Sequence, residues 1–156
     1  MGKIAIYPGF FDPFTNGHLD IVRKEADIFE KVFVVIGVNA DKARAFPADR
    51  IAEAIMQTLR QQRLDNCEVV IWQGLVAEYA RLNGIGYMIR GLRNNTDYNY
   101  EENIAAVNKL INPELESVYF RSNNIALSSS MVKELNSFGK DVSEYVPSAI
   151  LPLLKR

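Results

Sequence analysis

The sequence is poor in the residues that cross-link a small protein or bind metal ions: it has one cysteine, Cys67, and one histidine, His18. A lone cysteine can form neither an internal disulfide nor a cysteine metal cluster, which favours a reducing compartment, the cytoplasm. Positive charge is not in excess, because 18 lysines and arginines face 19 acidic residues, so we expect no nucleic-acid partner. No apolar run approaches the ~20 residues that span a bilayer, and no secretory signal is evident, so we expect no membrane partner.

What remains is the composition of an ordinary folded protein. The 156 residues are 48% hydrophobic and 24% charged, with a net charge of −1. A chain of this length can bury one continuous core, so we expect a single domain spanning residues 1–156. Cys67 begins an apolar run, and we expect it to be a small core residue because no base beside it would activate the thiol.

Residues 4–18, IAIYPGFFDPFTNGH, read as a short strand, a loop and the start of a helix. Residues 4–7 are too few for a helix and too apolar for a loop, which indicates a buried strand. From Gly17 onward apolar residues recur every three or four positions, as in a helix that packs one face on a sheet. The N–H groups at the start of such a helix favour phosphate binding, and His18 lies there. Without further motifs, His18 would be read as a helix-start residue satisfied by hydrogen bonds.

Apolar runs and helical patterns alternate through the rest of the chain. Further strands are predicted at residues 32–38, 68–72, 87–89 and 117–120, with helices at 47–63, 75–82, 97–111 and 128–138. This alternation predicts right-handed crossovers and an α/β fold, a Rossmann-like doubly wound five-stranded parallel sheet. In such sheets ligands bind outside the carboxyl ends of the strands.

Polar residues with useful chemistry follow several of the predicted strands. His18 follows the first, Lys42 the second, Arg90 and Arg93 the fourth, and the serines at 128–130 the fifth. Arg90 is the most informative cation, since a charge directly after an apolar strand is costly unless it is paired or binds an anion such as phosphate. Lys42 alone reads as a solvated surface cation, and serines before a helix are commonly caps.

Three motifs together resemble the phosphopantetheine adenylyltransferase branch of the nucleotidyltransferase superfamily. They are T-x-G-H at residues 15–18, R-G-L-R followed by D-x-x-Y-E at residues 90–101, and S-S-S-x-V-K at residues 128–133. The resemblance extends over residues 3–147. It implies reversible transfer of the adenylyl group of ATP to 4'-phosphopantetheine, giving dephospho-coenzyme A and pyrophosphate, with Mg2+ bound mainly through the ATP phosphates. It also implies a homohexamer, with dephospho-coenzyme A or coenzyme A as product or feedback ligand.

The same resemblance implies roles for individual residues. His18 would be the catalytic residue, stabilising the α-phosphate as charge develops. The nucleotide would contact Phe10, Phe11, His18, Gly91, Leu92, Arg93, Glu101, Asn124, Ile125, Ala126, Leu127, Ser128, Ser129 and Ser130. The acceptor would contact Phe10, Lys42, Val76, Arg90 and Asn108. Two residues also have purely structural interpretations: Val76 could equally be a core residue, and Asp97 is expected to cap its helix.

One residue departs from the family pattern in the first motif. Phe10 stands where relatives carry threonine or serine, whose hydroxyl contacts the transferring phosphate. Either the backbone N–H at Phe10 is enough, or activity is reduced, or the acceptor is another phosphorylated compound. A nucleotide-binding or coenzyme A-binding sensor that has lost catalysis is the alternative from another class. Asn124 is a milder departure, at a position where relatives often place an aromatic residue near adenine.

Overall fold

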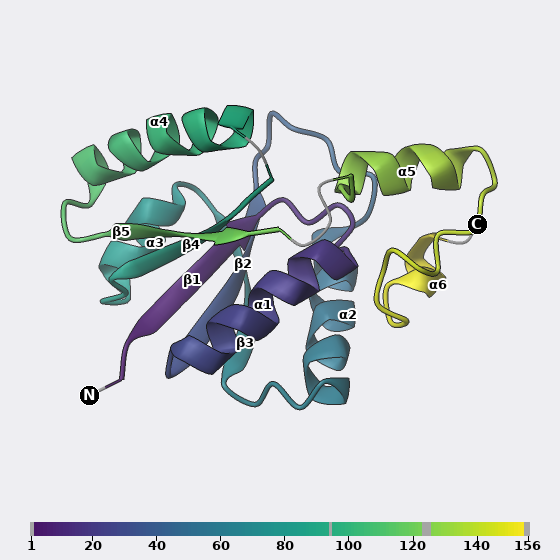
Figure 1. The fold of residues 1–156 in the computed structure, drawn as a ribbon, viewed down its shortest axis with the longest axis horizontal. Helices are drawn as coiled ribbons and strands as arrows, with labels where there is room; N and C mark the ends of the chain where they lie inside the picture. Colours follow the sequence, from purple (N-terminus) through teal and green to yellow (C-terminus); the bar gives the residue numbers. More distant parts are fainter. Residues whose placement is uncertain (1, 94, 123–125, 155–156) are drawn as a thin grey trace.

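The computed structural model describes residues 2–93, 95–122 and 126–154, with the backbone alone considered at 95–101. Five strands form a sheet in the order β3-β2-β1-β4-β5, and every neighbouring pair is parallel (Figure 1). The elements are β1 Ile4–Gly9, α1 Asn16–Ile28, β2 Lys31–Val38, α2 Ala48–Gln61, β3 Cys67–Gln73, α3 Val76–Leu82, β4 Tyr87–Leu92, α4 Asn95–Ile111, β5 Glu116–Arg121, α5 Ser129–Ser137 and α6 Leu151–Leu154. The predicted α/β fold with a five-stranded parallel sheet is confirmed.

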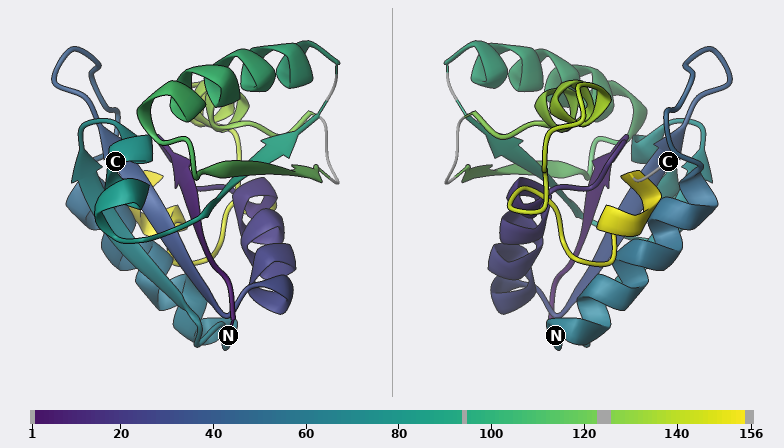
Figure 2. Two further views of the ribbon diagram at one scale, coloured as in Figure 1. Left: turned by 90° about the vertical axis from the view of Figure 1, so that its left-hand side faces the viewer. Right: turned by 90° about the vertical axis from the view of Figure 1, so that its right-hand side faces the viewer.

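The two faces of the sheet carry separate apolar clusters, as a doubly wound sheet requires. Alternate residues of β1 and β2 point to opposite faces: Ala5 and Val34 pack with α1 and α2, whereas Ile6 and Val35 pack with α3. In Figures 1 and 2, β4 and β5 lie between α4 and α1. In the described residues, no helix is both long and apolar enough to cross a bilayer.

The helix ends agree with most of the capping signals. Ser128 caps α5, since its Oγ accepts a hydrogen bond from the Met131 N–H at 3.1 Å. Gly139 follows the end of α5 with a φ of 73°, a conformation that glycine adopts at little cost. Cys67 is buried in the core, as expected.

Two predicted boundaries around β4 were wrong. This strand continues to Leu92 instead of ending at Ile89, because its ladder with β5 extends to the pair Leu92 and Arg121. Arg90 and Gly91 therefore belong to the strand itself. The helix that follows begins at Asn95, so Asp97 lies within its first turn and is not the residue that caps it.

Candidate active site

The loop after β1 folds back on itself so that aromatic side chains enclose His18. Phe11 has a φ of 50°, and its ring lies so close to Gly9 that a Cβ there would come within 2.7 Å of it. The ring centroids of Phe11 and Phe14 lie 4.9 Å and 5.4 Å from that of His18, and Tyr7 adds a third ring at 6.4 Å. A side chain at position 9 would therefore displace the Phe11 ring that packs on the imidazole.

Thr15 fixes the orientation of the His18 ring through hydrogen bonds at the start of α1. As the N-cap of α1, Thr15 donates its backbone N–H to Nδ1 of His18 at 2.9 Å. Its Oγ1 accepts the backbone N–H of His18 at 3.4 Å. This is a capping box in which histidine replaces the usual glutamate or glutamine. Because Nδ1 accepts a hydrogen bond, the neutral ring carries its proton on Nε2, at the opposite edge.

The surroundings of His18 keep it neutral. Burial, and then the positive charges of Arg90 and Arg93, lower the pKa of His18 from 6.5 to about 4. At neutral pH the side chain is therefore an uncharged hydrogen-bond donor through Nε2, well suited to an anionic oxygen but not to accepting a proton from solvent.

A cleft of about 380 Å³ opens at the carboxyl ends of β1 and β4, with His18 in its wall. Its lining includes these predicted residues: Phe10, Phe11, His18, Arg90, Gly91, Arg93, Leu127, Ser128 and Ser129. Arg90 also donates to the carbonyl oxygen of Pro8 at 3.0 Å, which holds its guanidinium at the end of β1. Two distant segments, represented by Arg90, Gly91 and Arg93 and by residues 127 to 129, thus line the same cleft as the first loop.

Other predicted residues lie outside this lining. They are Lys42, Val76, Leu92, Asn108, Ala126 and Ser130. Val76 and Asn108 belong to the layer of α3 and α4: Val76 packs on the second apolar cluster, and Asn108 is buried with its Nδ2 directed to the sulfur of Met88 at 3.7 Å. The side chain of Glu101, and residues Asn124 and Ile125, fall outside the described part of the chain.

Ser128 and Ser129 use their hydroxyls to build the site. The Ser128 hydroxyl is the cap of α5, and Ser129 donates its Oγ–H to the carbonyl oxygen of Pro13 at 2.7 Å. The second bond ties the start of α5 to the loop after β1. Since these hydroxyls already make protein contacts, the backbone N–H groups at the start of α5 are the better candidates for holding phosphate oxygens.

Asp12 is a structural residue of the site that the sequence reasoning did not single out. Its side chain is 2% exposed, and its two carboxylate oxygens accept the backbone N–H groups of Ala45 and Phe46 at 2.8 Å and 2.9 Å. Lys133 of α5 approaches the same carboxylate at 3.5 Å. Asp12 thereby connects the loops after β1 and β2 with α5. In the sequence Asp12 belongs to the turn after the first strand and precedes the T-x-G-H motif at a fixed distance, but neither feature indicated this structural role.

Thr15, Tyr7 and Ser122 also contribute to the cleft without having been assigned a role from the sequence. Thr15 could have been found, because a threonine three positions before His18 matches the spacing of a capping box. Tyr7 and Ser122 carry no such local signal. The resulting site combines a neutral imidazole donor, two arginines and a helix N-terminus, an arrangement that stabilises negative charge on phosphate.

Comparison with known proteins finds relatives that match nearly the whole chain. The model of the cytidylyltransferase-like family matches residues 6–135. The phosphopantetheine adenylyltransferase of Cytophaga hutchinsonii is 44% identical over 152 residues, covering 96% of this chain and 100% of that protein. That of Heliobacterium modesticaldum is 41% identical, covering 95% and 88%. The fold is similar to that of Plasmodium falciparum nicotinic acid mononucleotide adenylyltransferase, with a TM-score of 0.69 over 97% of this chain and 96% of that one at 13% identity.

Proposed function

The chain belongs to the phosphopantetheine adenylyltransferases within the cytidylyltransferase-like family, and from that premise we propose that it transfers the adenylyl group of ATP reversibly to 4'-phosphopantetheine. The products are dephospho-coenzyme A and pyrophosphate, a step of coenzyme A biosynthesis. The observation that carries the proposal is the half-buried His18, kept neutral by its surroundings, in the wall of a cleft that Arg90 and Arg93 also line.

The chemistry is a displacement at phosphorus. An oxygen of the acceptor's terminal phosphate forms a bond to the α-phosphorus of ATP, and the bond from that phosphorus to the α,β-bridging oxygen breaks, releasing pyrophosphate. The attacking phosphate is already ionised at neutral pH, so the reaction needs no general base and no covalent intermediate. Positioning of the two phosphates and stabilisation of the developing charge are then the whole task of the protein.

We propose a separate role for each of the residues that position the phosphates or stabilise the charge. The Nε2–H of His18 donates to a non-bridging oxygen of the α-phosphate, where negative charge grows in the transition state. Arg90 and Lys42 attract the acceptor phosphate, and Arg93 and the start of α5 hold the nucleotide. Val76 and Asn108 are proposed to contact the pantetheine arm, as the family resemblance implies, although they lie outside the cleft wall described above.

We propose that Mg2+ enters with ATP, bound by the nucleotide's phosphates. Among the described residues, no three of His, Cys, Asp and Glu gather to form a protein site for a metal ion. The carboxylate of Asp12 is already occupied by two backbone N–H groups and faces Lys133, so it does not fit the role of a ligand. The ion would screen phosphate charge, and we assign it no step of its own.

We further propose assembly into a homohexamer, with coenzyme A as a feedback ligand. Exposed apolar side chains on the layer of α3 and α4 support a subunit interface there: Leu75, Leu82, Val107 and Leu110 are between 54% and 84% exposed. Light scattering after size-exclusion chromatography measures the assembly, and a monomer at working concentration would rule it out. The cytoplasmic location stays a prediction from the sequence.

The test of the proposed function is pyrophosphate release from ATP with a panel of acceptors. We expect turnover with phosphopantetheine and little with nicotinamide mononucleotide or nicotinic acid mononucleotide. Turnover with one of the nucleotides alone would assign a different acceptor. Binding of ATP or coenzyme A without turnover of any acceptor would show that the protein is a sensor and not an enzyme.

A further inference from the structure

Phe10, the residue that departs from the family pattern, forms a platform for two cations. The ring centroid of Phe10 lies 4.8 Å from Nζ of Lys42 and 4.4 Å from Cζ of Arg44. Both distances are within the range of a cation–π interaction. The ring is half-buried and lines the cleft, whereas Lys42 is exposed and lies outside the lining. We call Phe10, Lys42 and Arg44 the Phe10 platform.

The two cations of the Phe10 platform are held differently. The guanidinium of Arg44 donates to the carbonyl oxygens of Phe10 and Phe11 at 2.7 Å and 3.3 Å, so its position depends on the backbone as well as on the ring. Among the residues that the structure describes, the Lys42 ammonium contacts the ring of Phe10. Removal of the ring should therefore release Lys42 and leave Arg44 in place.

The loop that carries Lys42 rises beyond the carboxyl ends of the strands, at the opposite end of the molecule from the N-terminus (Figure 2). Its second half is anchored to the first loop by Asp12, through the N–H groups of Ala45 and Phe46. A long, flexible lysine side chain at the edge of such a loop samples many rotamers, and a ring face restricts it. The ring that restricts it also lines the cleft.

We propose that Phe10 is a positioning residue for the acceptor, holding the ammonium of Lys42 at the mouth of the cleft so that the terminal phosphate of the acceptor is recognised by charge. A phenyl ring has no hydrogen bond to donate to that phosphate, and its electronegative face does not attract an anion. Its contribution passes through Lys42. The inference rests on the proposed function, and it identifies the acceptor's phosphate as the group that Phe10 helps to select.

A double-mutant cycle tests the coupling between the two residues. Phe10→Leu removes the aromatic face but keeps an apolar side chain, and Lys42→Met keeps the aliphatic stem but removes the charge. We expect Phe10→Leu to raise the KM for phosphopantetheine about two- to fivefold, with kcat and the KM for ATP nearly unchanged. In the Lys42→Met background the same change should have no further effect, and Phe10→Trp should keep the parent KM. Effects of Phe10→Leu and Lys42→Met that multiply, or an equal rise in the KM for ATP, would overturn the inference.

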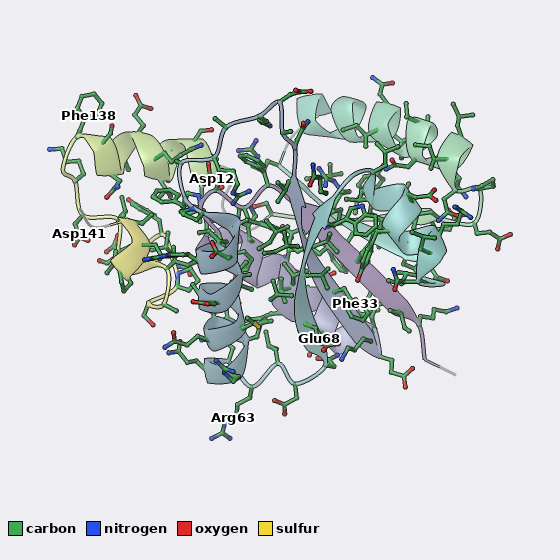
Figure 3. The ribbon with its side chains drawn as sticks, turned by 180° about the vertical axis from the view of Figure 1, so that it is seen from behind. Asp12, Phe33, Arg63, Glu68, Phe138 and Asp141 are labelled. Atoms are coloured by element: carbon green, nitrogen blue, oxygen red, sulfur yellow. The ribbon has the colours of Figure 1, made fainter. Side chains whose placement is uncertain are left out.

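A matched control is available at the other end of the sheet. Nζ of Lys31 lies 5.6 Å from the ring centroid of Phe33, a pair of the same kind outside the cleft. Figure 3 shows Phe33 beside Glu68, the ion-pair partner of Lys31, and well away from Asp12. Phe33→Leu should leave the KM for phosphopantetheine unchanged. A rise equal to that in Phe10→Leu would mean that general loosening of the fold is being measured.

A spectroscopic readout separates failure of this inference from failure of the proposed function. The aromatic ring should shift the NMR signals of the Lys42 ε-methylene in the ligand-free protein, and Phe10→Leu should abolish that shift. If the shift is present but the parent protein turns over no acceptor, the proposed function is wrong while the platform exists. If the parent is active and the shift is absent, the positioning role of Phe10 is wrong.

Discussion

Thr15 and His18 bind each other at the start of α1: the Thr15 backbone N–H donates to Nδ1 of His18 at 2.9 Å, and the Thr15 Oγ1 accepts the His18 backbone N–H at 3.4 Å. The bond to Nδ1 leaves the proton of the neutral ring on Nε2. The same pair therefore caps a helix and sets the tautomer of the residue that we propose to act on the α-phosphate. Stability and catalysis should respond together when it is altered.

Thr15→Val tests this pair. The change keeps the shape of the side chain but removes Oγ1, so we expect the free energy of unfolding to fall by about 1 kcal/mol through loss of the cap. We also expect kcat to fall, because the His18 main chain loses its tether. Urea denaturation and steady-state kinetics measure the two effects. Thr15→Ser retains the hydroxyl and should behave as the parent; an equally destabilised serine variant would contradict the role given to Oγ1.

His18→Ala should lower kcat about 10²- to 10³-fold while changing the KM for ATP far less, because the Nε2–H acts mainly on charge that develops in the transition state. His18→Gln returns a neutral donor near the position of Nε2 and should recover part of the rate. Steady-state kinetics with varied ATP distinguish the cases. Equal losses in kcat and ATP affinity would show that His18 serves ground-state binding instead.

The depressed pKa of His18 predicts how stability depends on acid. Because the pKa is about 4 in the folded chain and 6.5 ordinarily, the unfolded chain binds the extra proton first as the pH falls. Stability from this residue is complete above pH 6.5 and is lost as the pH falls from 6.5 towards 4, by about 1.4 kcal/mol per pH unit. His18→Gln should remove this slope in thermal denaturation series, and an unchanged slope would place the titration elsewhere.

The raised pKa of Glu25 predicts that stability depends on pH in the opposite sense to the contribution of His18. It is fully buried in α1, and within the described part of the chain neither carboxyl oxygen has a hydrogen-bond partner. Burial raises the pKa of Glu25 from 4.5 to about 9, so the folded chain holds one more proton than the unfolded chain between those values. Stability should therefore fall by about 1.4 kcal/mol per pH unit as the pH rises through this window.

Glu25→Gln should abolish that loss. The variant should melt at a higher temperature than the parent at pH 8, with a difference that shrinks as the pH is lowered towards 4.5. Glu53→Gln, on the exposed face of α2, is the matched control and should show no such growing difference. A parent and a Glu25→Gln variant with parallel pH profiles would show that Glu25 is ionised in the folded protein.

Asp12→Asn tests the connection between the loops after β1 and β2. Asparagine offers one acceptor oxygen in place of two, so one of the N–H groups of Ala45 and Phe46 loses its partner, and we expect the free energy of unfolding to fall by about 1 to 3 kcal/mol. Asp20→Asn removes an exposed carboxylate paired with Arg23 and should change stability by less than about 0.5 kcal/mol. Similar losses in both variants would argue against a special role for Asp12.

Local patterns in the sequence were sufficient to predict the α/β architecture. Strands and helices were recognised because apolar periodicity and capping residues act over a few neighbours, as at residues 4–18 and at Ser128. The predicted boundaries were least reliable around β4, where Arg90 and Gly91 look like the start of a loop but continue the strand. The reason is that a ladder with β5 is a contact with a distant segment, and local propensity yields to it.

By itself, the sequence determined that a strand, a loop and a helix bearing His18 would form, and its motifs pointed to adenylyl transfer. Only the tertiary structure decided the chemical state of that histidine, because its neutrality comes from partial burial against Phe11 and Phe14 and from Arg90 and Arg93, on and just after β4. It also decided that Ser129 of α5 donates a hydrogen bond to Pro13 and that the ring of Phe10 contacts two cations. These properties depend on how the crossovers bring distant strand ends together. Local sequence patterns do not determine contacts between segments that lie far apart in the chain.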